Sequence, residues 1–443
     1  MAGVIGQRVN ILLPPRAFRW NFVVMGLDLT LFVLGINFAS VYGILPLFVR
    51  HLSGSNLALG AIPALRAANL LPPLFVAGLT ERLRHKKPFV IGWTVVERLP
   101  YLVLAVATPL LATTQPAVLL WLLFAMIALS TLAGGVATPA WLDLIARMFP
   151  AHWRGRFFGL SSALGGLLGV AGSGGAAYLL GHFGWSTGGA LCFACTFVCL
   201  AISFVFIALG REPPVGPAVT GPVRSSVPAL WHRLPALVRG DRNLRWYLLT
   251  IMLVTGAGAA TAFYVVDAKR VLGLTDAAAS LFAVLLLVAS TAGSAAWGYI
   301  GDRYGHKRTV VAGAACTGGA ALVAVLARQP WVGLPGYCLV FALVGLGSSA
   351  LQLASLTFIV DFAPPKQRPT YIGVAMLTQA PFAFGAPIMA AAIADRRGYA
   401  TVFALAAILG VLATLVVARC VRDPRTDDHA APLLLHESDA HPY

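Results

Sequence analysis

Four ionisable residues stand inside long apolar runs of this sequence, where charge is otherwise rare: Asp28, Arg66, Glu97 and Arg98. A charged side chain in a hydrocarbon environment is costly and normally needs a partner. Two acids at a depth similar to two bases fit either of two chemistries. Asp28 or Glu97 could take up a proton reversibly as an arginine approaches and withdraws, or the four residues could form a fixed ion-pair network that joins helices.

The segments that carry these residues must be membrane helices. Hydrophobic residues make up 58% of the 443 positions and charged residues only 11%, against about 45–50% and 25% in soluble domains. This composition excludes an ordinary soluble protein. The 45 glycines and 28 prolines fit as well, because both residue types are more frequent in membrane helices than in soluble ones.

Twelve apolar segments are long enough to span a bilayer core, which takes roughly 20 helical residues. We expect an all-α membrane protein with twelve transmembrane helices in two pseudo-symmetric six-helix bundles. The helices are predicted near residues 20–48, 57–79, 88–112, 116–141, 157–181, 186–210, 245–266, 277–298, 309–327, 331–360, 370–394 and 400–419. The predicted domains are an N-terminal segment 1–19, bundles 20–210 and 245–419, a linker 211–244 and a disordered tail 420–443.

Lysine and arginine indicate the orientation of these helices, because cytoplasmic loops hold the excess. With the N-terminus inside, 24 of the 32 basic residues fall in cytoplasmic segments, six in outer loops and two within helices. Both termini are therefore predicted to be cytoplasmic. The same distribution accounts for the net charge of +16 through membrane topology, so we expect no nucleic-acid partner.

Two charged signatures occur twice, half a chain apart. The first joins the second and third helices of each half, and its residues are Glu81, Arg82, Lys86 and Lys87 in one copy and Gly298, Gly301, Asp302, Arg303, Gly305, Lys307 and Arg308 in the other. The second lies at the next inner loop of each half and contains Asp143 and Arg154, then Asp361 and Arg368. This repetition indicates a duplicated membrane unit, which is typical of transporters.

The segment 298–308 resembles the loop signature of the major facilitator superfamily, and the copy at 77–87 is a degenerate version of it. With twelve helices, the resemblance covers residues 20–419 and implies a state-dependent latch between the two halves. Its acids would be Glu81 and Asp302, and its bases Arg82 and Arg303. The alternative is that these charges only set the topology.

The same resemblance implies a central cavity lined by the first, fourth, seventh and tenth helices. Its candidate residues, with one from the eleventh helix, are Asn37, Trp141, Tyr264, Gln352 and Gln379. Asp28 and Thr30 also resemble the Asp-x-Thr pattern of superfamily exporters. The fourth helix lacks a mid-membrane arginine and the fifth lacks a Gly-Pro pair, so two other exporter features are missing.

We therefore expect a secondary active transporter of a small organic solute that works by alternating access, coupled to protons and favouring export. An organic-anion or nutrient uptake symporter, or a non-transporting membrane sensor or assembly factor with this fold, remains an alternative. We expect no enzymatic activity, no metal and no cofactor, with the proton gradient as energy source. The expected form is a monomer that spans the cell membrane several times.

Overall fold

Helices make up all the regular secondary structure in the part of the chain that the computed structural model describes, which covers residues 15–41, 43–213, 237–362 and 368–422. The predicted all-α class is thus confirmed for these residues. An apolar sequence favours this outcome because a helix satisfies its backbone hydrogen bonds internally, without water. The described helices group into two compact units.

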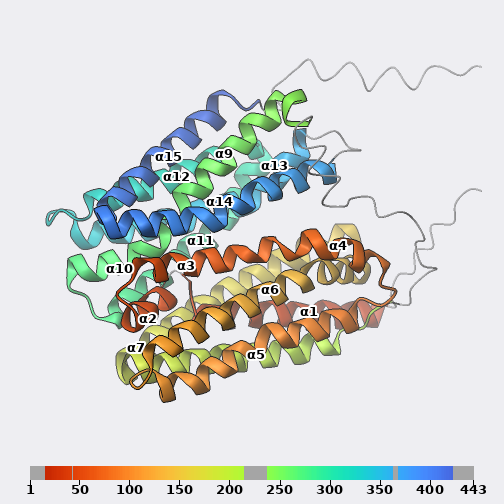
Figure 1. The fold of residues 1–443 in the computed structure, drawn as a ribbon. Coiled ribbons are helices and arrows are strands. Elements are labelled where there is room, and N and C mark those ends of the chain that lie inside the picture. Colours follow the sequence, from red (N-terminus) through yellow and green to blue (C-terminus); the bar gives the residue numbers. More distant parts are fainter. Residues whose placement is uncertain (1–14, 42, 214–236, 363–367, 423–443) are drawn as a thin grey trace, which may run out of the picture. The chain divides into compact units, whose positions relative to one another are not determined.

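The first unit comprises residues 1–40 and 68–226. Its helices are α1 (Pro15–Phe38), the short 3-10 helix η1 (Ala68–Leu70), α4 (Pro72–Arg82), α5 (Lys87–Leu111), α6 (Pro116–Met148) and α7 (Ala151–Leu209). Helices α1 and α5 both pack along α7, and α5 also packs along α6 (Figure 1). This arrangement gathers α1, α5, α6 and α7 around one interior.

Helix α7 reverses direction in its middle. Gly184 has a left-handed φ of 74° and a ψ of 177°, a combination that needs glycine. Beyond this turn the chain folds back on itself, because a Cβ atom on Gly188 would lie 2.6 Å from the backbone oxygen of Leu179. The 59 residues of α7 thus form two antiparallel helices joined by a tight turn.

Aromatic side chains fix one end of the first unit. Phe22 of α1 meets Phe149, Trp153 and Phe157 edge-on, each with ring centroids 5.9 Å apart. Phe149 and Phe157 stack at 4.7 Å. Such pairs contribute about 0.5–1.5 kcal/mol each beyond their buried area, so they hold α1 firmly against α6 and α7.

The second unit comprises residues 41–67 and 227–443. Its helices are α2 (Ile44–Leu52), α3 (Asn56–Ala67), α9 (Arg242–Gly258), α10 (Thr261–Leu272), α11 (Asp276–Tyr304), α12 (His306–Leu326), α13 (Gly333–Phe362), α14 (Arg368–Arg397) and α15 (Tyr399–Arg419). Helix α12 packs between α13 and α15, and α9 packs on α15 (Figure 1).

Residues 41–67, which the sequence predicts in the N-terminal bundle, pack within the second unit. Helix α3 lies along α14, and α2 contacts α10. Asn56 at the start of α3 donates to Asp395 at 2.8 Å and accepts from the Tyr399 hydroxyl at 2.5 Å. The chain therefore crosses from the second unit back to the first between Ala67 and Ala68.

Close backbone approach and a buried ion pair stabilise the second unit. Gly410 of α15 faces Gly318 of α12 so closely that a Cβ atom on Gly410 would lie 2.3 Å from the Cα atom of Gly318. The carboxylate of Asp267, fully buried, accepts from Arg328 at 2.9 Å and from the Tyr337 hydroxyl at 2.6 Å. A buried charge needs such partners.

Both units close with the same amide clamp. Asn21 of α1 donates from Nδ2 to the carbonyl of Arg211 and accepts from its N–H through Oδ1, both at 2.8 Å. Asn243 of α9 makes the same two contacts with Arg422, at 3.3 and 2.7 Å. In each unit this joins the N-terminal part of one helix to the segment just after the last helix, which fits a duplicated architecture.

Ten helices of the described residues are long and apolar enough to cross a membrane. One of these segments covers 54 residues of α7, about 80 Å of helix at 1.5 Å per residue, against a hydrocarbon core of about 30 Å. It must fold back at Gly184 to fit, whereas α3 and α4 are each shorter than a full span. The count of twelve helices, the cytoplasmic termini and the domain boundaries stay predictions.

Candidate functional site

A cavity of about 180 Å³ lies inside the first unit, among α1, α5, α6 and α7. Each of α1, α5 and α6 presents one face to it, because residues three, four and seven positions apart share a side of a helix. The lining residues are Asp28, Leu29 and Phe32 of α1; Thr94, Glu97 and Arg98 of α5; Gly134, Ala137, Thr138 and Trp141 of α6; and Ile207 of α7.

Asp28 and Arg98 form a buried charged pair at this cavity, each with 4% of its surface exposed. The Asp28 Oδ1 and Arg98 Nη2 atoms are 3.5 Å apart. Ser203 of α7 bridges them, because its hydroxyl donates to Asp28 at 2.6 Å and accepts from Arg98 at 3.0 Å. The pair joins α1, α5 and α7 through side chains that are almost entirely shielded from solvent.

The guanidinium of Arg98 is held from several sides. Its Nε donates to the carbonyl of Leu200 at 2.9 Å and its Nη1 to the carbonyl of Thr94 at 3.1 Å. The rings of Phe32 and Phe204 each lie with their centroid 5.8 Å from its central carbon. Removing one partner of a buried ion pair typically costs about 3–5 kcal/mol, so the charges of Asp28 and Arg98 depend on each other.

Glu97 is the second acid of the cavity, and 17% of its side chain is exposed. Its Oε2 atom lies 3.8 Å from Nη1 of Arg98, which is an ion pair beyond hydrogen-bond distance. Its Oε1 atom lies close to α6, only 2.5 Å from where a Cβ atom on Gly134 would be. The half-buried Trp141 stands on the same face of α6, and its side chain is within hydrogen-bonding reach of Asp28.

Arg66, the fourth residue of the expected cluster, belongs to the last turn of α3 in the second unit. The cluster that the first unit assembles consists of Asp28, Glu97 and Arg98. Sequence reasoning missed Ser203, which couples the two charges. A serine in an apolar helix carries no distinctive signal, because Ser and Thr commonly return their hydrogen bond to the helix itself.

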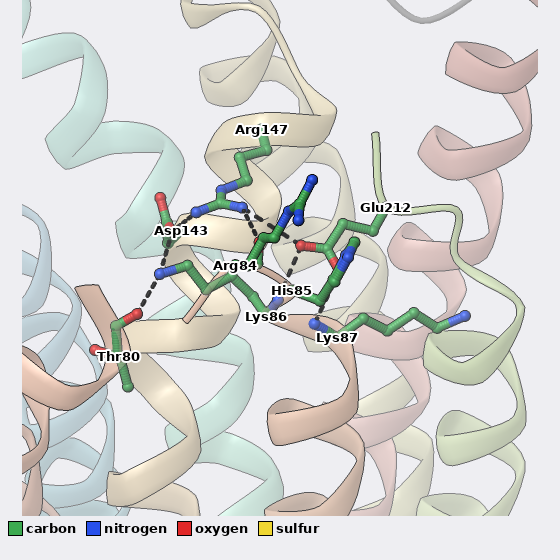
Figure 2. A network of polar contacts seen from close by, with 8 residues as sticks. All are labelled: Thr80, Arg84, His85, Lys86, Lys87, Asp143, Arg147 and Glu212. Carbon is green, nitrogen blue, oxygen red and sulfur yellow. Dashed lines mark hydrogen bonds and ion pairs between the residues drawn. The ribbon is translucent and has the colours of Figure 1, made fainter. Parts of the chain in front are cut away.

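A second polar site lies at the loop between α4 and α5 (Figure 2). Glu212, which follows α7, accepts from the backbone N–H of Lys86 at 2.9 Å and of Lys87 at 3.1 Å. Its carboxylate also faces Arg147 of α6 at 3.5 Å. An acid at a helix N-terminus satisfies free N–H groups and meets the positive end of the helix dipole. Glu212 thus supplies the N-terminal cap that α5 lacks locally.

Asp143 and Lys86 complete this loop network. Lys86 is buried, and its Nζ atom lies 3.1 Å from Oδ2 of Asp143 and also donates to the carbonyl of Thr80. Arg147 pairs with Asp143 at 3.0 Å on the same helix and donates to the carbonyl of Arg84 at 3.1 Å. The network therefore ties α4, α5, α6 and the segment after α7 at one point (Figure 2).

Comparison with known proteins identifies the family. The sequence matches the Major Facilitator Superfamily over residues 27–289 and again over 247–434. The chain belongs to the major facilitator superfamily. Together with its apolar helices, this makes it a multi-pass integral membrane protein.

The sequence alignments with curated relatives cover only part of this chain and part of each relative. An uncharacterized protein of Mycobacterium tuberculosis is 24% identical over 301 residues, which span 66% of this chain and 56% of that relative. The chain thus aligns with little more than half of it. A Na(+), Li(+), K(+)/H(+) antiporter of Planococcus maritimus is 35% identical over 91 residues, or 20% of this chain and 22% of the antiporter.

Solved transporters share the fold. The nucleoside transporter NupG superposes with a TM-score of 0.67 at 13% identity, covering 92% of this chain and 100% of that one. The xylose transporter XylE from E. coli gives 0.66 at 14% identity, with the same two coverages. At such low identity these similarities establish the superfamily fold and nothing about the solute.

The superfamily signature of the second unit, residues 298–308, contains the turn between α11 and α12. Gly305 ends α11 and precedes α12 with a φ of 92°, which a side chain would strain. Lys307 donates to the carbonyl of Ala418 at 3.0 Å, and Arg303 donates to the Tyr299 hydroxyl at 2.6 Å. Arg308 lies over the ring of Tyr304 at 5.4 Å, while Gly298 and Gly301 belong to the last turns of α11.

Several residues of the expected latch have side chains outside what the structure describes. They are Glu81, Arg82, Arg154, Asp302, Asp361 and Arg368. Of the first-unit latch residues, Lys86, Lys87 and Asp143 meet in the loop network of Figure 2. Sequence reasoning missed Glu212 and Arg147, although the Arg-acid-Pro run at 211–213, which recurs at 422–424, was a signal for the former.

The five expected cavity residues differ in their surroundings. Trp141 lines the described cavity, whereas Asn37 donates to the carbonyl of Val33 in its own helix at 2.7 Å. In the second unit Tyr264 is buried against Phe403, with ring centroids 5.0 Å apart. Gln352 is exposed, and Gln379 donates to Thr255 at 3.5 Å. Their role at a common cavity stays a prediction.

Proposed function

We propose that this superfamily member is a secondary active transporter that moves a small organic solute by alternating access, coupled to protons. The observation that supports this is the buried Asp28–Arg98 pair, with Glu97 beside it, at a cavity inside the first unit. Ionisable groups buried in membrane helices are rare and mark ion or substrate pathways. The family supplies the transport mechanism, and the charge cluster supplies the coupling.

Protonation of Asp28 would act through Arg98. The proton cancels the negative charge of Asp28 that faces the guanidinium. It also weakens the hydrogen bond that Ser203 donates to Asp28, while Ser203 still accepts from Arg98. Arg98, still bonded to the carbonyls of Leu200 and Thr94, then has Glu97 as its remaining acidic partner among the lining residues. A change of charge state at one carboxyl is thereby converted into a change of contacts among α1, α5 and α7.

Export against an inward proton gradient is the direction we favour. The support is the similarity of one-fifth of the chain to an antiporter that exchanges cations for protons. It is joined by the Asp-x-Thr pattern at Asp28 and Thr30. An uptake symporter would use the same charge cluster with solute and proton moving together, so the relative direction of the two fluxes decides between them.

The loop network between α4 and α5, shown in Figure 2, is the second part of the proposal. We assign it a latch role in which Lys86 and Asp143, with Glu212 and Arg147, hold one conformational state. Its counterpart in the second unit would use Asp302 and Arg303. Pairing of this kind contributes little at an exposed surface, but Lys86 and Glu212 are both nearly buried, which strengthens it.

The test is proton-coupled flux in proteoliposomes. A thermal-shift screen of the purified protein against sugars, organic acids, amino acids, lipophilic cations and lipids first supplies a ligand, since binding stabilises the folded state. Its uphill movement is then measured with an imposed proton gradient for the native chain, Asp28→Asn, Glu97→Gln and the control Asp395→Asn. Asp395 is an exposed acid of the second unit.

We expect Asp28→Asn to lose uphill transport while keeping downhill flux, because coupling and passage are separate steps. The control should behave as the native chain does. Full uphill transport in both Asp28→Asn and Glu97→Gln would refute the coupling proposal. Absence of flux for every bound ligand would instead favour a non-transporting sensor or assembly factor.

A further inference from the structure

The cavity inside the first unit carries an unbalanced charge. Among its lining residues, which come from α1, α5, α6 and α7, only Asp28, Glu97 and Arg98 are charged. When both acids are ionised, two negative charges face one positive charge. Because Asp28 and Arg98 form the buried pair that Ser203 bridges, Glu97 is the lining acid that stands outside this bridged pair.

Arg98 is poorly available to a ligand. Its three nitrogen atoms already donate to Leu200, Thr94 and Ser203 at 2.9–3.1 Å, and two phenyl rings flank the guanidinium. An anion would have to displace several of these short contacts from a side chain that is 4% exposed. The Glu97–Arg98 distance of 3.8 Å is longer than any of them, and the Glu97 side chain is the more exposed of the two, at 17% against 5%.

The walls of the cavity suit a cation with an apolar body. Trp141 and Phe32, both half-buried, line it together with the aliphatic side chains of Leu29 and Ile207. An ammonium group is attracted to the face of an aromatic ring, most strongly to tryptophan and when water is excluded. A carboxylate beside an aromatic face is a recurrent combination for recognising organic ammonium ions.

The volume of the cavity suits a small ligand. At about 180 Å³ the cavity lies below the roughly 300–1,000 Å³ of sites for drug-sized molecules. It is somewhat larger than an engineered apolar cavity of about 150 Å³ that holds benzene. One aromatic ring, or an aliphatic group of similar bulk, with one ammonium group attached therefore fits.

We propose that this cavity binds a small organic monocation, with its ammonium group at Glu97 and its apolar body against Trp141 and Phe32. The inference rests on the proposed function and names the substrate class of that site.

Binding of three matched probes to the purified full-length protein tests the substrate class. Benzyltrimethylammonium is a permanent cation, benzyl alcohol is neutral and benzoate is an anion, and all three carry one phenyl ring. Thermal stabilisation and titration calorimetry are recorded at about pH 5.5 and about pH 7.5, because ligand binding stabilises the folded state by mass action. We expect only the cation to bind.

Four variants locate the site. Glu97→Gln and Trp141→Leu should each weaken cation binding about tenfold or more, by loss of the charge and of the ring face, while Trp141→Phe retains most of it. Gly134→Ala should weaken it as well, because the new methyl group would occupy the place of the Glu97 carboxylate. Folding of each variant is checked by its melting temperature without ligand.

Two controls match these changes. Trp121→Leu removes a tryptophan from the same helix α6, at an exposed position, and Asp395→Asn neutralises an exposed acid of the second unit. Both should bind the cation as the native chain does. Equal loss in Trp121→Leu and Trp141→Leu would show that the cavity is not the site.

The outcomes separate this inference from the proposed function. Binding of benzoate in preference to the cation, or cation binding that Glu97→Gln leaves unchanged, would overturn the inference. Proton-coupled flux of an anion would do so while leaving the transporter proposal intact. Cation binding at Glu97 without flux in proteoliposomes would support the site and refute transport.

Discussion

Replacing Glu212 by alanine should destabilise the first unit more than is usual for a residue that lies outside the helices. The carboxylate accepts two hydrogen bonds from the N-terminus of α5, at 2.9 and 3.1 Å, and faces Arg147 at 3.5 Å. Only 8% of the side chain is exposed, so water replaces these contacts poorly.

The magnitude follows from the contacts that are lost. A hydrogen bond to a charged group contributes about 1.5–3 kcal/mol, and loss of a helix N-cap typically costs about 0.5–2 kcal/mol. The two N–H bonds share one carboxylate, so the sum is less than twice the first figure. We expect Glu212→Ala to lower the free energy of unfolding by about 2–4 kcal/mol, and Glu212→Gln by about half as much, since an amide oxygen can still accept.

The assay is denaturant unfolding in lipid bicelles, followed by tryptophan fluorescence. Arg84→Ala is the matched control, because the Arg84 side chain is exposed and only its carbonyl takes part in the network. It should change stability by less than about 0.5 kcal/mol. An effect of Glu212→Ala no larger than that of Arg84→Ala would refute the reasoning, since capping of α5 would then contribute nothing.

Two further perturbations test the packing of the second unit. Asp267→Asn should lower the free energy of unfolding by about 2–3 kcal/mol. This is less than the usual cost of a broken buried pair, because Arg328 is 35% exposed and can reach water. An unchanged denaturant midpoint would contradict this prediction. Gly410→Ala should lower the free energy of unfolding by about 1–3 kcal/mol, because the added methyl group overpacks against Gly318. The control Gly174→Ala, where a Cβ atom meets open space, should be neutral or stabilising. Similar melting temperatures for the two alanine variants would show that α12 and α15 accommodate the methyl group without cost.

The sequence is informative where a solvent constraint acts on many residues at once. Long apolar runs predict helices because the backbone must bond to itself in lipid, and helices make up all the regular secondary structure of the described residues. The depth of Asp28 and Arg98 within their runs predicts a shared level, and the two side chains do meet. Their role in coupling stays a prediction.

The contacts that depend on chain path are beyond such reasoning. Ser203 is one of several serines spread over the apolar helices, and the reversal of α7 at Gly184 brings it to Asp28. Glu212 follows the sixth apolar run, where polar residues are common, so its bonds to Lys86 and Lys87 follow from packing of α5 beside the end of α7. Arg66 belongs to α3 in the second unit, so its part in the charge cluster stays a prediction.

The path of residues 41–67 links the two units more than once along the chain. The chain leaves the first unit after Ser40, packs α2 and α3 into the second, and re-enters the first at Ala68. Together with the linker near 226–227, the polypeptide thus passes between the units three times.

The helix geometry changes at the passage near Ala68. The α-helical hydrogen-bond pattern stops at Ala67, and a 3-10 turn follows over Ala68–Leu70 before Pro72 and Pro73 begin α4. Proline has no N–H to extend the preceding helix, and a 3-10 segment within a helix often marks a hinge. The stretch 57–79, which the sequence predicts as a single helix, is thereby divided between α3 in the second unit and α4 in the first.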